Sequence, residues 1–120
     1  MCHRILIAHR DQGCAQALAV ALHAGVPSVR VVGSHQELTA AIPKYRPDVV
    51  VCDLETVELD RVKKLALDEQ VLVICTHRVP DEFMWTAALE AGALDCCALS
   101  DPGSILLAIE RNRQAMVRAA

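Results

Sequence analysis

Side chains capable of chemistry follow several apolar runs of the sequence. The stretch "VVVCDLE" places Asp53 directly after a β-branched run, and "RILIAHRD" places His9 and Arg10 after another. Thr76 follows a third run, "VLVIC". A carboxylate can act as a nucleophile, and a neighbouring cation or hydroxyl can stabilise the charge that develops in such a reaction. These side chains can act together only if their apolar runs are neighbouring strands of one sheet.

The apolar runs alternate with helical patterns along the chain. We expect strands at residues 4–8, 29–33, 48–52, 71–75 and 94–99. Helical spacing occurs at residues 15–22, 38–45, 59–66 and 81–91, and a last helix opens at Asp101 and Pro102 and runs to the end of the chain. Ser34 and Glu37 form a capping-box pattern, and Gly92 is the expected stop of the fourth helix. Five β-α units with near-continuous apolar strands predict an α/β fold, in which helices cover both faces of a parallel sheet.

Composition limits the class of protein. The chain has 120 residues, of which 53% are hydrophobic and only 2% aromatic, so we expect one domain over residues 1–120 with an aliphatic core. The formal net charge of -3 gives no indication of binding to nucleic acid or to anionic membranes. The apolar runs are too short to span a membrane, and the N-terminus does not resemble a signal peptide, so a cytoplasmic location is expected.

Six cysteines invite a metal or disulfide interpretation, but four of them, Cys52, Cys75, Cys96 and Cys97, lie in apolar strand patterns. The chain contains no C-x-x-C pair, so buried, reduced thiols are expected. A metal site built from histidines and cysteines, a nucleotide-binding loop and a catalytic Cys-His pair are all less well supported.

Four motifs together resemble the receiver domain of two-component response regulators, which has the flavodoxin-like (CheY-like) fold. They are "ILIAHRD", "RPDVVVCDL", "VLVICT" and "ALEAGALD", and the resemblance covers essentially the whole chain. It implies a five-stranded parallel sheet in the order 2-1-3-4-5. It also implies that Asp53 is the phosphoacceptor for a histidine kinase and that Thr76 contacts the phosphoryl group.

The chain departs from the receiver pattern at the positions that hold charge. His9 and Arg10 stand where the family has the acidic pair that binds Mg²⁺, and Leu99 stands where it has a lysine. The switch aromatic is replaced by Cys96, and Asp11 is better placed to cap the first helix than to bind metal. We therefore expect no metal and no cofactor, and Mg²⁺ binding is doubtful. One hypothesis is that Arg10 pairs with Asp53 and replaces the ion electrostatically. The alternative is that Arg10 points into solvent and leaves Asp53 without a partner.

Two functions remain open. The chain is either a receiver in a phosphorelay, with Asp53 as the phosphoacceptor of a degenerate site, or a phosphorylation-independent interaction or dimerisation module. Neither function is enzymatic. The expected partners are a histidine kinase or another signalling protein, and a second copy of the chain, with no nucleic acid or membrane. Phe83 and Trp85 mark a candidate interaction surface, although Trp85 alternatively covers the edge of the core.

Overall fold

The computed structural model describes residues 4–112, in which five strands and five helices alternate. The strands are β1 (Arg4–Ala8), β2 (Ser28–Val32), β3 (Val49–Asp53), β4 (Leu72–His77) and β5 (Asp95–Ala98). The helices are α1 (Gln12–His23), α2 (His35–Tyr45), α3 (Leu59–Leu67), α4 (Glu82–Glu90) and α5 (Pro102–Arg111). These elements confirm the predicted order and lie within a few residues of the expected boundaries. The predicted continuation of the last helix beyond residue 112 lies outside the described residues.

All five strands are parallel, in the order β2-β1-β3-β4-β5. The chain first moves outward from β1 to β2 and then returns to the other side of β1 to form β3, so the direction of winding reverses between β1 and β3. Ala8 pairs with Cys52 across that junction, and Asp53 pairs with Thr76 on the next strand. Parallel α/β sheets bind ligands beyond the carboxyl ends of the strands at this kind of switch point. The predicted fold class and strand order are confirmed.

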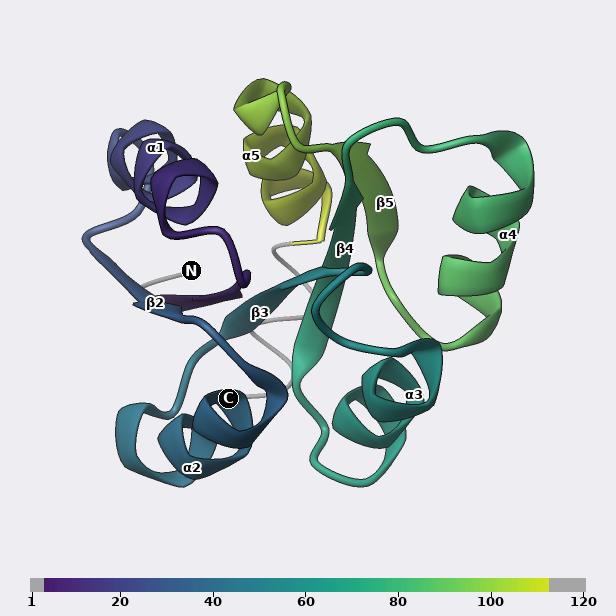
Figure 1. Ribbon diagram of the computed structural model, residues 1–120, viewed down its shortest axis with the longest axis horizontal. Coiled ribbons are helices and arrows are strands. Elements are labelled where there is room, and N and C mark those ends of the chain that lie inside the picture. The colour runs from purple at the N-terminus through teal and green to yellow at the C-terminus, as the bar shows by residue number, and fades with distance from the viewer. Residues whose placement is uncertain (1–3, 113–120) are drawn as a thin grey trace.

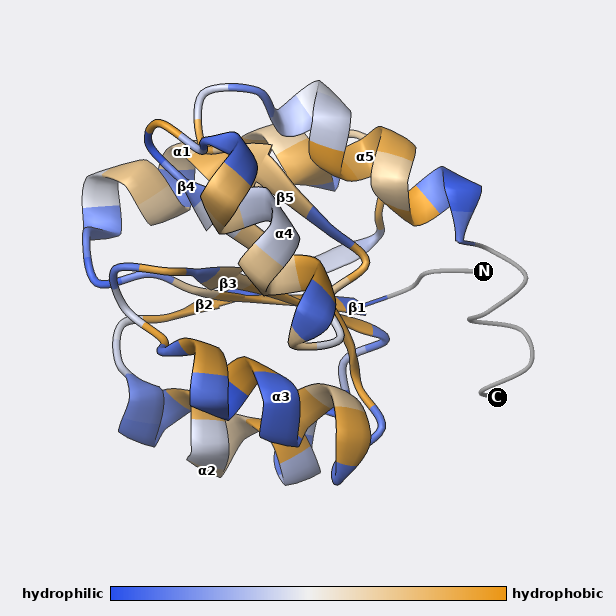
Figure 2. Ribbon diagram, turned by 90° about the vertical axis from the view of Figure 1, so that its right-hand side faces the viewer, coloured by the Kyte–Doolittle hydropathy of each residue, from blue (hydrophilic) through white to orange (hydrophobic). Residues whose placement is uncertain are grey.

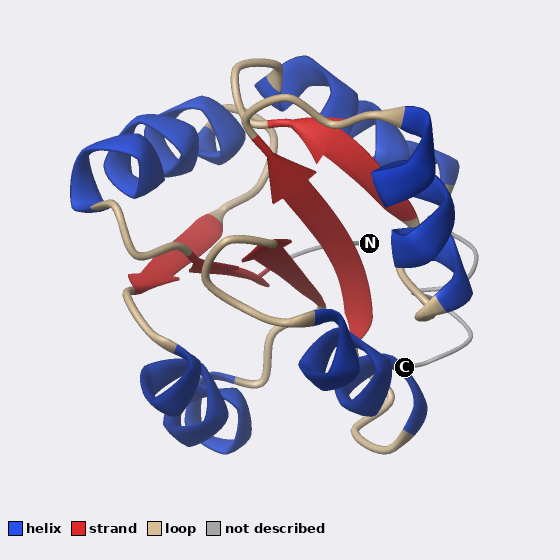
Figure 3. Cartoon of the chain, turned by 45° about the vertical axis from the view of Figure 1, so that its right-hand side comes forward, coloured by secondary structure: helices blue, strands red, loops and turns tan. Residues whose placement is uncertain are grey.

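Helices cover both faces of the sheet. Figure 1 shows α1 and α5 on one side of the strands and α2 and α3 on the other, and Figure 2 shows the mostly apolar strands running between these layers. The cartoon in Figure 3 shows the strands enclosed by helices. Residues 5 and 7 of β1 pack with α1 and α5, whereas residues 6 and 8 pack on the face covered by α2, α3 and α4. Alternation along a strand therefore supplies two aliphatic cores from one sheet.

Helix caps fix the chain next to the strand ends. The Asp11 carboxylate accepts a hydrogen bond from the Cys14 amide at 3.0 Å, and the Asp101 carboxylate accepts one from Ser104 at the start of α5. Ser34 accepts from the Glu37 amide at 3.1 Å, which confirms the predicted cap of α2. Gly92 follows α4 with φ of +99°, and a Cβ there would lie 2.8 Å from the Ala66 Cβ, so glycine is required on both counts.

Candidate functional site

Asp53 is the last residue of β3 and lies at the switch point of the sheet, with only 2% of its surface exposed. Its Oδ2 accepts a hydrogen bond from the Glu55 amide at 3.2 Å. Its Oδ1 accepts one from the hydroxyl of Thr76, its register partner on β4, at 3.3 Å. The structure thus brings Asp53 and Thr76 together, in the relationship that the strand-end pattern predicts.

His9 directly follows β1 and is buried, and its backbone amide extends the β1–β2 pairing by donating to the Val32 carbonyl at 3.0 Å. The imidazole Nδ1 accepts a hydrogen bond from the Asp11 amide at 3.0 Å. Since Nδ1 acts as an acceptor, the ring proton lies on Nε2 and the imidazole is neutral. Nε2 lies 3.6 Å from Asp53 Oδ1 and has no hydrogen-bond partner within the described part of the chain. His9 therefore presents a buried N–H donor to the carboxylate at a distance too long for a hydrogen bond.

The Arg10 side chain does not pair with Asp53. Its guanidinium Nη2 bonds Glu55 Oε2 at 3.1 Å, and its backbone amide donates to the Thr56 hydroxyl at 2.9 Å. The hypothesis of an Arg10–Asp53 pair is therefore wrong in this structure. The Arg10 side chain is 64% exposed, as the alternative expected, but it bonds Glu55, and Asp53 keeps Thr76 as a partner. The β3–α3 loop brings the Glu55 carboxylate within reach of Arg10, so the guanidinium meets this more accessible carboxylate while Asp53 stays buried at the strand end.

Glu55 is the centre of a cluster formed by two arginines and a histidine. The Arg78 guanidinium bonds both carboxylate oxygens of Glu55, with Nη2 at 3.2 Å from Oε1 and 3.3 Å from Oε2. His77 Nε2 lies 3.4 Å from Oε1, so side chains that follow β1 and β4 meet on one loop residue. The Arg78 hydrogen bonds, assisted by the nearby His77 and Arg10, hold the pKa of the Glu55 carboxyl below its usual value.

The two histidines at this edge are held in the same way. His77 Nδ1 accepts a hydrogen bond from the Val79 amide at 3.1 Å, as His9 Nδ1 does from the amide two residues after it. Each imidazole consequently carries its proton on Nε2 and turns that N–H towards a carboxylate, Glu55 or Asp53. The local backbone after each strand therefore sets the tautomer of its histidine.

A small pocket of about 150 Å³, which we call the rim pocket, lies at the carboxyl edge of the sheet. Asp53, His9 and both arginines contribute to its lining. Its lining comprises His9, Arg10, Asp11, Cys14, Asp53, Glu55, Arg78 and Leu99. Leu99 leaves this side of the pocket apolar.

The donor set of the rim pocket does not fit Mg²⁺. This ion prefers oxygen ligands in octahedral geometry, usually including carboxylates. His9 and Arg10 contribute nitrogen atoms rather than oxygen ligands to this pocket, and the Asp11 carboxylate is engaged in capping α1. Within residues 4–112, no group of three or more His, Cys, Asp or Glu side chains is arranged to hold a metal ion.

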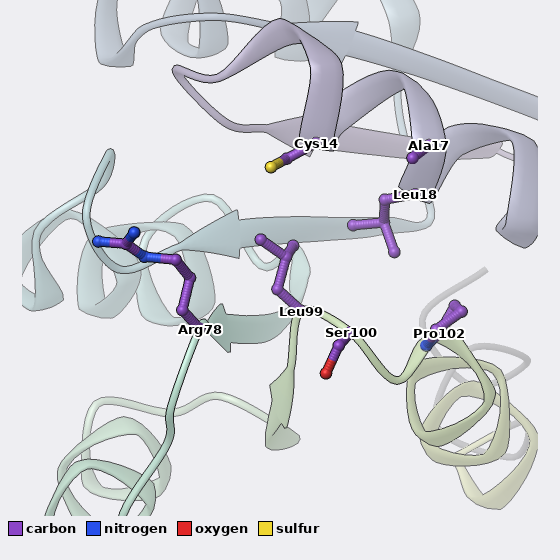
Figure 4. Close-up of a pocket in the computed structure, with 7 residues that line it drawn as sticks. All are labelled: Cys14, Ala17, Leu18, Arg78, Leu99, Ser100 and Pro102. Carbon is purple, nitrogen blue, oxygen red and sulfur yellow. The ribbon is translucent and has the colours of Figure 1, made fainter.

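A second hollow, of about 500 Å³, adjoins the rim pocket between α1 and the loop after β5. Figure 4 shows Cys14, Ala17 and Leu18 on one side, Leu99, Ser100 and Pro102 on the other, and Arg78 at one end. Cys14, Arg78 and Leu99 line both hollows. The polar rim pocket thus continues into a largely apolar groove.

The four strand cysteines are free thiols buried in the core, as predicted from their apolar surroundings. Cys52, Cys75 and Cys96 lie in register on neighbouring strands and on one face of the sheet, while Cys97 faces the other. Burial raises the pKa of the Cys75 thiol to about 12 and that of Cys97 also to about 12. Such thiols behave as small apolar side chains rather than nucleophiles.

The predicted interaction residues differ in their surroundings. Phe83 on α4 is 84% exposed, whereas Trp85 is 45% exposed and donates its indole N–H to Asp95 Oδ1 at 3.0 Å. Trp85 is therefore tied to Asp95 at the start of β5, but it is not among the residues that pack against either core. Both interpretations of Trp85 stay predictions. An interaction role for Phe83 stays a prediction.

The sequence pattern did not identify Glu55 and Arg78 as parts of the site. Both lie in loops immediately after β3 and β4, at the edge where ligands bind in parallel sheets. Glu55 comes two residues after Asp53, and Arg78 comes two residues after Thr76. Their opposite charges at equivalent positions after neighbouring strands could have indicated that they pair.

Comparison with known proteins gives one curated relative and many similar structures. The chain is 34% identical, over 110 residues, to the protein-glutamate methylesterase/protein-glutamine glutaminase of Agrobacterium fabrum. The alignment covers 83% of this chain but 30% of the relative, so the chain spans less than a third of that protein's length. No protein-family model matches the sequence.

The similar structures agree on the architecture. A CheY-like response regulator receiver domain protein from Methanospirillum hungatei matches with a TM-score of 0.78 at 18% identity, covering 100% of both chains. A LuxR-family two-component response regulator from Aurantimonas matches with a TM-score of 0.79 at 18% identity, covering 92% of this chain and 84% of that one. At such identities the likeness establishes the fold. Among the described helices, none is both long and apolar enough to cross a bilayer.

Proposed function

Since the chain has the CheY-like receiver fold of response regulators, we propose that it is a receiver domain in two-component signalling with Asp53 as its phosphoacceptor. The observation that carries this proposal is the position of Asp53. Its carboxylate is at the end of the central strand β3, accepts a hydrogen bond from Thr76 on β4, and lines a pocket at the switch point of the sheet.

The reaction is a phosphoryl transfer to a carboxylate. An Asp53 oxygen attacks phosphorus, and the bond from phosphorus to the donor's nitrogen or oxygen breaks with its electron pair on the leaving group. The product is an acyl phosphate on Asp53. The Thr76 hydroxyl and the His9 Nε2–H are donors beside the attacking carboxylate, and they can hydrogen-bond the oxygens of the transferred group.

Charge limits the rate of this reaction. The incoming phosphoryl group and the Asp53 carboxylate are both anionic, and among residues 4–112 no group of His, Cys, Asp or Glu side chains is arranged to hold a divalent ion. Arg10 and Arg78 are the permanent cations of the rim pocket, and both are engaged with Glu55. Because a missing electrostatic donor typically costs a factor of about 10²–10³ in rate, we expect slow transfer that does not require Mg²⁺.

The receiver fold also supports a proposal for the domain organisation, location and partners of the chain. Residues 1–120 act as one receiver domain that is not itself an enzyme and that operates in the cytoplasm. Its partners are a histidine kinase or another signalling protein, and a second copy of the chain is a further candidate, with the exposed Phe83 on α4 as a contact point.

A second function is supported by the same substitutions. His9, Arg10 and Leu99 replace the residues that make phosphorylation efficient in receivers, and Asp53 is nearly inaccessible. In this alternative, the domain binds its partner without phosphorylation and Asp53 plays no chemical part.

Acetyl phosphate distinguishes the two functions. The protein and an Asp53→Asn variant are incubated with acetyl phosphate, and intact mass is followed over time. Slow gain of one phosphoryl group by the wild type, absent from the variant, supports the phosphoacceptor. Equal masses for both proteins after prolonged incubation would exclude it and favour the phosphorylation-independent module.

A further inference from the structure

We propose that Arg10 and Arg78 form an oxyanion receptor at the rim pocket, that Glu55 is its resting occupant, and that a phosphoryl group on Asp53 displaces Glu55. The displacement rests on the proposed phosphoacceptor function, whereas the receptor itself can be tested without it. We call these two guanidiniums the arginine clamp.

The first support is the way in which the clamp holds Glu55. Arg78 bonds both carboxylate oxygens, and Arg10 adds a bond of 3.1 Å to Oε2. Planar guanidiniums bind carboxylates and phosphoryl groups through the same arrangement of N–H donors. A clamp that fits a carboxylate therefore fits the oxygens of a phosphoryl group.

The second support is proximity. Glu55 is two residues after Asp53 and donates its own backbone amide to Asp53 Oδ2 at 3.2 Å. Both arginines line the same 150 Å³ pocket as Asp53. Their side chains remain 64% and 71% exposed, so the long side chains can reorient through solvent with little loss of packing. An anion on Asp53 would thus compete with Glu55 at short range.

The third support is the unused donor on His9. Its Nε2 is buried, carries the ring proton and lacks a hydrogen-bond partner among residues 4–112. A buried donor without a partner costs free energy, so the site gains if an acceptor arrives. An oxygen attached at Asp53 would arrive next to this N–H, since the present separation from Oδ1 is 3.6 Å.

The charges in the rim pocket favour replacement of Glu55 by the phosphoryl group over binding of both anions at the clamp. At rest, the two guanidiniums are bonded to the carboxylate of Glu55, and Asp53 adds a second carboxylate to the lining of the same pocket. A phosphoryl group carries a charge of about −1.5 to −2 at neutral pH, more than the carboxylate that it modifies. The clamp gains more from that group than from Glu55, and expulsion of Glu55 removes a neighbouring negative charge. Release of Glu55 changes the loop between β3 and α3, so phosphorylation of Asp53 alters the surface of the protein at this loop.

Inorganic phosphate tests the receptor directly. The full chain is compared with Glu55→Gln, with the double variant Glu55→Gln/Arg78→Ala, and with Glu58→Gln as the matched control. Glu58 is exposed and its side chain makes no capping bond, so this control changes net charge equally without releasing the clamp. Phosphate is titrated into ¹⁵N-labelled protein, and shifts of the amides at residues 54–56 and 78 are followed by NMR.

We expect Glu55→Gln to bind phosphate about tenfold tighter than wild type or more, Glu58→Gln to match wild type, and the double variant to lose the gain. Equal affinity of Glu55→Gln and Glu58→Gln would overturn the receptor, as would a gain that persists without Arg78.

Acetyl phosphate labelling then tests displacement separately. If Glu55 competes with the phosphoryl group, Glu55→Gln gains label on Asp53 faster than Glu58→Gln does. Equal rates would overturn displacement. A complete lack of label in every protein would overturn the proposed function and displacement together, but would leave the receptor to be decided by the phosphate titration.

Discussion

The imidazole of His9 faces the carboxylate of Asp53, with Nε2 at 3.6 Å from Oδ1 and both side chains buried. Because His9 Nδ1 accepts from the Asp11 amide, this contact joins a neutral ring to a carboxylate and is not an ion pair. Asp53 is consequently surrounded by neutral donors, from His9, Thr76 and the Glu55 amide, while the guanidiniums of the pocket are bound elsewhere.

This arrangement predicts that neutralising Asp53 stabilises the fold. A buried carboxylate without a paired cation costs more to desolvate than its hydrogen bonds return. Asp53→Asn should therefore raise the free energy of unfolding by about 1 kcal/mol, measured by urea denaturation at neutral pH. Asp60→Asn, which alters an exposed aspartate on α3, should change it by less than about 0.5 kcal/mol. A destabilised Asp53→Asn protein would show that the carboxylate is better compensated than these contacts indicate.

The pH dependence of Glu55 follows from its cationic neighbours. Its pKa is lowered chiefly by the Arg78 hydrogen bonds, so the clamp contributes stability above the ordinary carboxyl pKa and loses it as pH falls through the lowered value. In a ¹³C NMR titration, the Glu55 carboxyl should titrate at lower pH in wild type than in Arg78→Ala. An unchanged midpoint in that variant would mean that Arg78 does not hold Glu55 in solution.

Cysteine reactivity should separate the core from the surface. With their pKa raised to about 12, Cys75 and Cys97 hold almost no thiolate at pH 8, and burial also blocks access. Iodoacetamide at pH 8, followed by peptide mapping, should leave both unmodified in the native protein and modify both after unfolding in urea. Comparable labelling of Cys75 before and after unfolding would contradict the packed core described for this sheet.

Introducing two carboxylates at positions 9 and 10 should create a metal site. His9→Asp/Arg10→Asp places two carboxylates beside Asp53 and removes one guanidinium, which creates the oxygen ligands that Mg²⁺ prefers. Calorimetry should show Mg²⁺ affinity rising by about tenfold or more over wild type. The control His9→Asn/Arg10→Asn, which adds no carboxylate, should bind as weakly as wild type. Micromolar affinity in the wild type would refute the view that its donor set excludes the ion.

The fold and the pairing of Asp53 with Thr76 could be predicted because both follow from backbone periodicity. Apolar strands alternating with capped helices require a covered parallel sheet, and strand ends in such a sheet share an edge. Asp11 and Asp101 were identifiable as caps for the same local reason.

The partner of Arg10 could not be predicted from such patterns. A long side chain beside a strand end can reach several carboxylates, and the choice depends on loop geometry that periodicity does not encode. Glu55 is closer to solvent than Asp53, and Arg78 shares it, so the guanidiniums gather on the loop residue. The tautomer of His9 likewise depends on a turn that aims the Asp11 amide at Nδ1.

The central claim is that side chains of the rim pocket, and not a metal ion, balance the negative charge at Asp53. It is tested by the metal dependence of phosphorylation. Wild-type protein is incubated with acetyl phosphate in excess EDTA and, in parallel, in saturating Mg²⁺, and the label on Asp53 is quantified by intact mass and peptide mapping. We expect slow labelling at equal rates in both conditions. Labelling that appears only with Mg²⁺ would contradict it.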